Sequence, residues 1–275
     1  ARFNRDVIQG TDLFSATTPN GTGEQLGLQV AYVHDDTRSP RLNIRHGLRA
    51  RVWAEMFVDG VATASAAGGE LTGPEQGWTF GTVGFDARRY VPLVGPSILA
   101  LRLAGDWSIG QRKLLHMLGG TDNSLSLQGN ANTPVDPDVP FAYQARIAPL
   151  RGFQSNVRNG ANVALANAEV RVPVFSGAGR GDFLKNLQAV AFADVGAAWT
   201  GPHPYSDENA FNFVTVQSNP ITVTVSNNRE PVLYDLGFGL RSRLLGYWVA
   251  ADWAYGVDDG ITLPRRFTLS LNFDF

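Results

Sequence analysis

The C-terminal decapeptide RFTLSLNFDF alternates strictly between apolar and polar side chains. Single polar residues separate Phe267, Leu269, Leu271, Phe273 and Phe275. Successive side chains of a β-strand point to opposite faces, so this segment predicts a strand with one wholly apolar face and one wholly polar face. In a chain built from such strands, the apolar faces must contact other apolar groups and the polar faces must contact water or polar groups.

The same alternation recurs upstream, in LRARVWAEMFV, ILALRLAGDWS, NAEVRVPVF and YDLGFGLRSR. It predicts nine strands, and a further strand is expected in the first 20 residues. Glycine is frequent (30 of 275 residues) and charged residues are only 17%, against about 25% in average soluble proteins. Both values favour an all-β chain with many turns. The nine strands are expected near residues 24–35, 47–59, 78–91, 97–108, 163–175, 187–199, 232–243, 247–256 and 267–275.

Two architectures can accommodate these strands. A soluble antiparallel sandwich buries the apolar faces in its core and exposes the polar faces to water. A transmembrane barrel turns the apolar faces to lipid and the polar faces to its lumen. The expected strands are roughly 9 to 13 residues long, as a tilted strand needs to cross a bilayer, and aromatic residues such as Trp199, Trp248 and Tyr255 lie near strand ends. These features favour an antiparallel transmembrane β-barrel.

The connections between the expected strands alternate in length, which also favours a barrel. The links at residues 92–97 and 243–246 are tight, whereas those at 109–162 and 201–231 are very long. Outer-membrane barrels have short periplasmic turns and long extracellular loops. We therefore expect residues 1–275 to form one barrel unit, with 109–162 and 201–231 as extracellular loops.

Composition and residue spacing argue against several other classes of protein. There is no cysteine, the formal net charge is −2, and no run of like charges suggests a nucleic-acid partner. No apolar run is long enough for a membrane-spanning helix. His34, His46, His116 and His203 lack metal-ligand spacing. No Ser/His/Asp or paired-carboxylate arrangement stands out, so we expect no enzymatic activity, no metal and no cofactor.

Several motifs occur in a characteristic order. They are HDDTRSPRLNIRHG, GFDARRYVPLVGPS, LGG at 118–120, LRGF at 150–153, NAEVRVPVF, AFADVGAAW, YDLGFGLRSR, VAADWAYGV and the terminal RFTLSLNFDF. Over residues 24–275 this order resembles the C-terminal half of the surface-antigen barrel shared by BamA, TamA and the two-partner secretion transporters. The resemblance implies a 16-stranded barrel of which 9 to 10 C-terminal strands are present. We therefore expect the chain to be N-terminally incomplete.

The resemblance also implies a role for the tripeptide Arg151, Gly152 and Phe153. In the family it is the tip of the sixth extracellular loop, here residues 109–162, which folds back into the lumen. Its arginine pairs with acidic groups on the following strands. Carried over to this sequence, the main acceptor is Asp194 and a second acceptor is Glu169. A charge-assisted, bidentate pair would be directional enough to fix a loop; without the resemblance, Arg151 would read as a solvated loop residue.

Alternation places both acceptors on polar faces. Glu169 shares its face with Arg171, and Asp194 shares its face with Gln188 and Gly196. Gly196 would let the loop approach the wall closely. The Asp194 strand is the least regular of the set, because Val190 and Phe192 lie on the same face as Asp194. Both carboxylates are expected to point into the lumen.

The function that the resemblance implies is assistance to the insertion or export of outer-membrane proteins in a Gram-negative cell. The expected location is the cell outer membrane, and the expected partners are outer-membrane lipid, accessory lipoproteins and barrel substrates. Phe267, Leu271, Phe273 and Phe275 resemble the C-terminal signal by which the assembly machinery recognises its substrates. The simpler interpretation is that these side chains face lipid, and both interpretations can hold together.

One departure from the family pattern concerns the spacing of two motifs. Residues 121–150 separate the paired glycines from the Arg–Gly–Phe tip, where family members have only a few residues. Long insertions of this kind resemble Bacteroidetes-type barrels, which follow a TolB-like β-propeller instead of POTRA repeats. They suggest the alternative function of a structural membrane anchor for a periplasmic propeller or partner complex, without insertase activity.

Overall fold

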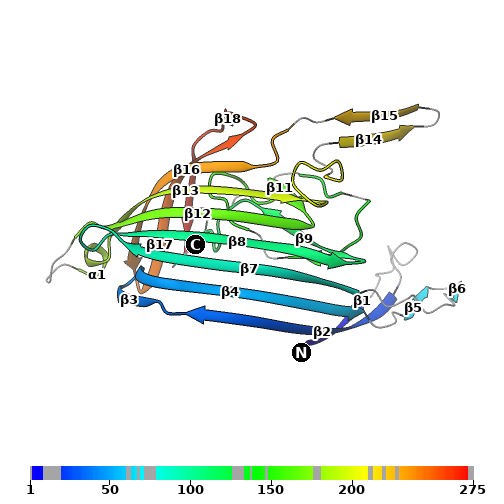
Figure 1. Cartoon of the computed structure of the whole chain (residues 1–275), viewed down its shortest axis with the longest axis horizontal. Helices are drawn as coiled ribbons and strands as arrows, with labels where there is room; N and C mark the ends of the chain where they lie inside the picture. Colours follow the sequence, from blue (N-terminus) through cyan, green and yellow to red (C-terminus); the bar gives the residue numbers. More distant parts are fainter. Residues whose placement is uncertain are drawn as a thin grey trace.

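The computed structural model describes residues 2–8, 20–59, 63–66, 69–70, 79–125, 133–136, 138–145, 148–175, 181–209, 213–218, 221–226 and 229–271. Most of its strands belong to one 14-stranded sheet. The long strands of this sheet form an antiparallel meander, in which each pairs with the next (Figure 1). They are β1 (Arg2–Ile8), β2 (Asn20–Asp35), β4 (Ile44–Asp59), β7 (Thr79–Pro92), β8 (Ile98–Gly110), β12 (Asn162–Pro173), β13 (Gln188–Trp199), β16 (Leu233–Leu244), β17 (Tyr247–Asp258) and β19 (Arg266–Ser270).

The predictions of an all-β chain and of antiparallel pairing are confirmed. Each of the nine expected strands has a counterpart in the meander, and β1 is a strand within the first 20 residues, paired with β2. β19 ends at Ser270, and Phe273 and Phe275 lie outside the described residues. Among these residues, no helix is both long and apolar enough to cross a membrane.

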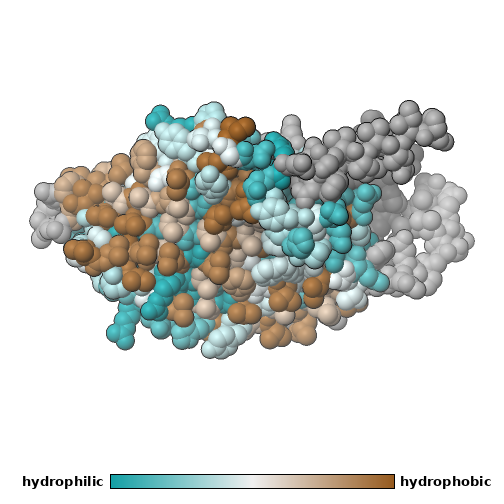
Figure 2. Space-filling model, turned by 45° about the horizontal axis from the view of Figure 1, so that its top comes forward, coloured by the Kyte–Doolittle hydropathy of each residue, from teal (hydrophilic) through white to brown (hydrophobic). Residues whose placement is uncertain are grey.

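The sheet exposes its apolar face and buries its polar face. On β16, Leu236 and Phe238 are 56% and 52% exposed, whereas Asp235 is 0% and Arg241 is 5% exposed. The same inversion holds on β12, where Val170 is exposed and Glu169 is buried. We call the apolar surface the outer face and the polar surface the inner face. Figure 2 shows apolar side chains gathered over much of the surface that the view presents.

The sheet does not close on itself, so closure of the predicted barrel stays a prediction. In the described part of the chain, neither β1 nor β2 pairs with β19. The free edge of β19 instead bonds to residues 123–125. Leu125 N donates to Leu269 O at 2.7 Å, and Leu271 N donates to Asn123 O at 3.1 Å. A short piece of the chain itself therefore occupies the last edge of the meander.

The 109–162 connection contains strands that the sequence analysis did not predict. They are β9 (Lys113–Leu118), β10 (Phe141–Gln144) and β11 (Arg158–Gly160), which form a small sheet in the order β10-β9-β11. In Figure 1 this sheet lies behind the meander. The strands are 3 to 6 residues long, and their sequences do not alternate between apolar and polar, so periodicity could not reveal them.

This connection packs its apolar side chains against the inner face. Leu118 and Leu150 are 0% exposed and Phe153 is 2% exposed. They join Leu165 of β12 and Leu233 of β16 in one buried cluster. Burying a side chain of this size contributes roughly 1.5–3 kcal/mol. The connection is thus a packed layer on the sheet.

The remaining elements are short and lie at the ends of the long strands. The 201–231 connection contains the hairpin β14 and β15, which pair only with each other and project past the end of the sheet (Figure 1). The segment between β12 and β13 contains one helical turn. The elements are β3 (Arg38–Arg41), β5 (Thr63–Ala66), β6 (Gly69–Glu70), α1 (Asp182–Lys185), β14 (Phe213–Ser218), β15 (Ile221–Ser226) and β18 (Ile261–Thr262).

Candidate functional site

The Arg–Gly–Phe tip is a tight turn held by the paired glycines. Phe153 N donates to Leu150 O at 3.2 Å, which closes the turn. Leu150 N donates to Gly120 O at 3.0 Å, and Gly120 N donates to Phe153 O at 3.1 Å. Gly119 and Gly120 both have positive φ angles (117° and 75°), which residues other than glycine rarely adopt. The LGG and LRGF motifs, distant in sequence, therefore form one structural unit.

The structure brings Arg151 together with both expected acceptors. Its Nε donates to Asp194 Oδ2 at 2.7 Å and its Nη2 donates to Asp194 Oδ1 at 2.6 Å, a bidentate fork. Its Nη1 donates to Glu169 Oε1. The guanidinium also lies 3.6 Å from the centroid of the Phe192 ring. Phe192, an apolar residue on a polar strand face, thus serves as the platform on which the arginine stacks.

Glu169 is shared by three arginines. Besides Arg151, it accepts from Arg171 Nε at 2.7 Å, and from Arg241 Nη1 and Nη2 at 3.0 and 2.9 Å. Glu169 is 1% exposed and Arg171 is 0% exposed. Removing one partner from a buried ion pair typically costs about 3–5 kcal/mol, because the remaining charge is left uncompensated. These groups therefore depend on one another.

Gly152 has no room for a side chain. Its N–H donates to Asp235 Oδ2 at 2.8 Å. A Cβ atom on Gly152 would lie 2.5 Å from Asp235 Cβ and 2.8 Å from Gly256 N. Asp235 stands directly opposite Asp194 on the neighbouring strand, so the tip supplies a guanidinium to one of two adjacent acidic side chains and a backbone N–H to the other.

Two glycines of the inner face make room for the 109–162 connection. A Cβ on Gly196 would lie 3.0 Å from a methyl carbon of Leu118. A Cβ on Gly256 would lie 2.8 Å from the Phe153 ring. The close approach expected at Gly196 is therefore made by Leu118, while the tip itself lies against Gly256. The glycine in VAADWAYGV is the sequence signal for the second approach.

The hydrogen-bond network continues from Glu169 to the connection that precedes β4. Arg171 Nη1 donates to Asn43 Oδ1 at 3.0 Å, and Asn43 Nδ2 donates to Gln188 Oε1 at 3.2 Å. Gln188 Nε2 then donates to Leu42 O at 2.9 Å. Asn43 has a φ of 59°, which asparagine tolerates better than most residues. The sequence analysis placed Arg171 and Gln188 on the polar faces of their strands but missed Asn43.

The two described residues of the proposed C-terminal signal, Phe267 and Leu271, lie on the outer side of the sheet. Phe267 is half-exposed, and its ring centroid lies 5.0 Å from that of Trp253. Leu271 is also exposed. Phe273 and Phe275 lie outside the described residues, so the proposed recognition signal is placed only in part.

The cluster is suited to holding the tip in place. Three guanidinium groups (Arg151, Arg171 and Arg241) bind the acidic side chains of Glu169 and Asp194, and the backbone N–H of Gly152 binds Asp235. Among the described residues, no group of three or more His, Cys, Asp or Glu side chains is arranged to hold a metal ion. We define the Arg151 cluster as the six ionisable residues Arg151, Arg171, Arg241, Glu169, Asp194 and Asp235.

No protein-family model and no curated protein sequence matches the chain. Among solved structures, it is similar to the crystal structure of BamA from Haemophilus ducreyi lacking POTRA domains 1–3. The TM-score is 0.40 at 11% sequence identity, over 96% of this chain and 57% of that chain. This chain thus spans little more than half the length of that structure, and a likeness at this level does not establish a family.

Proposed function

We propose that the chain is part of the wall of an outer-membrane β-barrel, with its outer face in lipid. The inverted faces support this. Exposed apolar patches larger than a few hundred Å² are rare on soluble monomers, yet apolar side chains cover the outward positions of β8, β16 and β17. The opposite face buries Glu169, Arg171 and Asp235. Apolar outside and polar inside is the pattern of a transmembrane barrel.

Within this location, we propose that the barrel assists the insertion or export of other outer-membrane proteins, and that it does so without enzymatic chemistry. The observation that carries the proposal is the Arg151 cluster. A loop tip with the Arg–Gly–Phe sequence lies on the inner face, and its arginine forms a bidentate pair with Asp194. This contact is the one implied by the resemblance to the surface-antigen barrels.

The edge of β19 offers a route for such an activity. β19 pairs with β17 over only Arg266–Ser270, and its other edge is bonded by residues 123–125. An exposed strand edge can pair with an incoming strand through its main-chain groups. We propose that substrate strands and accessory proteins of the outer membrane meet the barrel here.

Site-specific photo-cross-linking in cells tests this activity. A photoreactive residue at Leu269 is expected to trap newly made barrel proteins, and the same residue at Tyr234, on β16, which is paired along both edges, serves as the control. Trapping no better at Leu269 than at Tyr234 would contradict the insertase proposal. Enrichment of one periplasmic protein by a photoreactive residue at Val94, in the exposed turn that would face the periplasm, would instead favour the anchoring function.

A further inference from the structure

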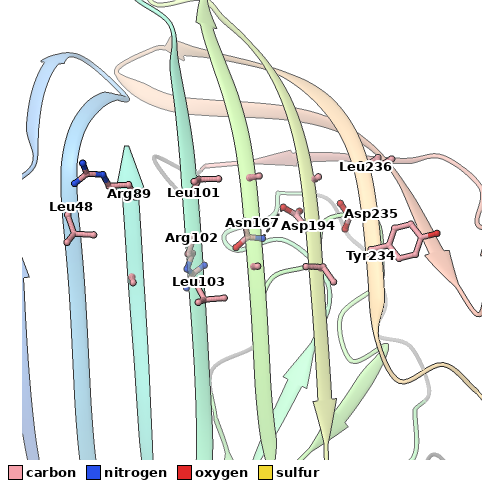
Figure 3. Close-up of a pocket in the computed structure, with 15 residues that line it drawn as sticks. Leu48, Arg89, Leu101, Arg102, Leu103, Asn167, Asp194, Tyr234, Asp235 and Leu236 are labelled. Atoms are coloured by element: carbon pink, nitrogen blue, oxygen red, sulfur yellow. Dashed lines mark hydrogen bonds between the residues drawn. The ribbon is translucent and has the colours of Figure 1, made fainter. Parts of the chain in front are cut away.

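The outer face carries a groove that spans β4 to β16. Its volume is about 480 Å³ and its exposed lining is almost entirely apolar. Figure 3 shows Leu101 and Leu103 beside it on β8, with Tyr234 and Leu236 on β16 across from them. The groove lies on the opposite side of the sheet from the Arg151 cluster.

The groove exists because three outward positions between these walls are alanines. Ala168 of β12 is directly opposite Leu101 of β8 and Ala193 of β13. Ala166 is directly opposite Leu103. Methyl groups on two adjacent strands, between taller side chains, leave a depression with an apolar floor. A void in an apolar surface loses dispersion contacts, so an apolar chain that fills it is stabilised.

One end of this groove is cationic. Arg89 of β7 stands directly opposite Leu48 of β4 and Leu101 of β8, and all three point outward. Figure 3 shows the Arg89 guanidinium beside Leu48. Among the described outward positions of β4, β7, β8, β12, β13 and β16, Arg89 is the one charged side chain.

Arg89 is exposed and has no acidic partner among the described residues. An arginine on the lipid-facing side of a barrel is strongly destabilising at the bilayer midplane and costs little near the interface. Arg89 is three positions before Pro92, the last residue of β7, so its long side chain can reach the interface. A lipid phosphate there would supply the missing anion.

We propose that this groove is a binding site for one glycerophospholipid, with the phosphate on Arg89 and an acyl chain over Ala166, Ala168 and Ala193. The proposal rests on the membrane location proposed above. Charge complementarity selects the headgroup, because a guanidinium can donate two parallel hydrogen bonds to a phosphate. Arg89 is near the short turn at residues 93–97, which in outer-membrane barrels faces the periplasm. The periplasmic leaflet consists of glycerophospholipids, so we commit to that source.

Native mass spectrometry of the protein purified from outer membranes tests the site. The delipidated protein is titrated with phosphatidylglycerol, and bound lipid is counted. Arg89→Gln is expected to weaken binding of the most tightly held lipid about tenfold, since the substitution removes the hydrogen bonds between the charged guanidinium and the phosphate. Arg89→Lys is expected to restore part of this affinity, and Ala168→Leu, which fills the groove, is expected to weaken binding as well.

Ala54→Leu is the matched control, because Ala54 is also outward on β4 but lies outside the groove. Unchanged affinity in both Arg89→Gln and Ala168→Leu would overturn the proposal, as would equal losses in Ala54→Leu. Displacement of phosphatidylglycerol by lipid A would overturn the choice of lipid. If the wild-type protein does not fractionate with membranes, the proposed membrane location is wrong. If only the cross-linking at Leu269 is absent, the insertase proposal is contradicted and the lipid site is not.

Discussion

The two long connections of this chain attach to the sheet in different ways. The 109–162 connection lies on the inner face, where Arg151 is 7% exposed and contacts two carboxylates. In the 201–231 connection, β14 and β15 pair only with each other, and the Tyr205 hydroxyl donates to Glu230 at an exposed position. Both contacts involve carboxylates, but only the first is removed from water.

This difference in solvent access determines how much each contact contributes to stability. Exposed pairs contribute little because water competes for the same groups, whereas buried charges must have partners. We therefore expect substitutions in the Arg151 cluster to alter folding and equivalent substitutions in the 201–231 connection to leave it nearly unchanged.

The largest effect is expected for Glu169→Gln. Neutralising this carboxylate leaves the guanidiniums of Arg151, Arg171 and Arg241 without their shared counter-charge, at a cost of about 3–5 kcal/mol. Thermal unfolding, followed by the β-sheet circular dichroism signal, measures the loss. Glu230→Gln is the control in the other connection; equal effects of the two substitutions would contradict the expected difference.

The next effect concerns the pair between Arg151 and Asp194. Arg151→Ala and Asp194→Ala should each lower the unfolding temperature, and the double variant should lower it little further, because the two side chains act as one unit. Arg151→Lys keeps the charge but loses the bidentate fork, so it should recover only part of the loss. Fully additive effects would mean that the pair does not contribute as a unit.

A smaller effect is expected for Gly152→Ala. The added methyl group would meet Asp235 Cβ at 2.5 Å, and such overpacking typically costs about 1–3 kcal/mol. Gly181→Ala is the matched control, since a Cβ there meets nothing within 4 Å. The comparison can be read from the unfolding temperatures of the two variants, and equal shifts would argue against a close fit of the tip.

The smallest effect concerns pH and the 201–231 connection. The hydrogen bond to Glu230 raises the pKa of Tyr205 above its ordinary value of 10.0. A raised pKa means that the contact is present below pH 10 and is lost as pH rises through the higher value. The difference in tyrosinate absorbance between the wild-type protein and Tyr205→Phe measures this pKa, and global stability should not follow it.

Alternation was sufficient to predict the most regular of the long strands. In β16, for example, Tyr234, Leu236 and Phe238 alternate with Asp235 and glycines, and both the strand and its two faces follow from that pattern. Short strands such as β11 carry no such signal, because three residues cannot establish a period. Their structure depends on what they pack against.

The site was predicted in its charged pair but not in its extent. The motif order supplied Arg151, Asp194 and Glu169, whereas Asn43 and Arg171, which are hydrogen-bonded to each other, lie 128 residues apart in the chain. Their proximity depends on the strand register and on the fold of the connection before β4. Phe192 appeared as an irregularity in a polar strand face, and only the position of Arg151 over its ring explains it.

The bonds between residues 123–125 and the free edge of β19 have a consequence for any incoming strand. Two main-chain groups of that edge are already occupied: Leu269 O accepts from Leu125 N, and Leu271 N donates to Asn123 O. A tethered segment competes at an effective concentration of about millimolar for a short flexible link. A strand arriving from solution would therefore have to displace a segment that stays attached to the same chain. This competition would exclude sequences that pair weakly, and it would keep the edge of β19 covered in the absence of an incoming strand.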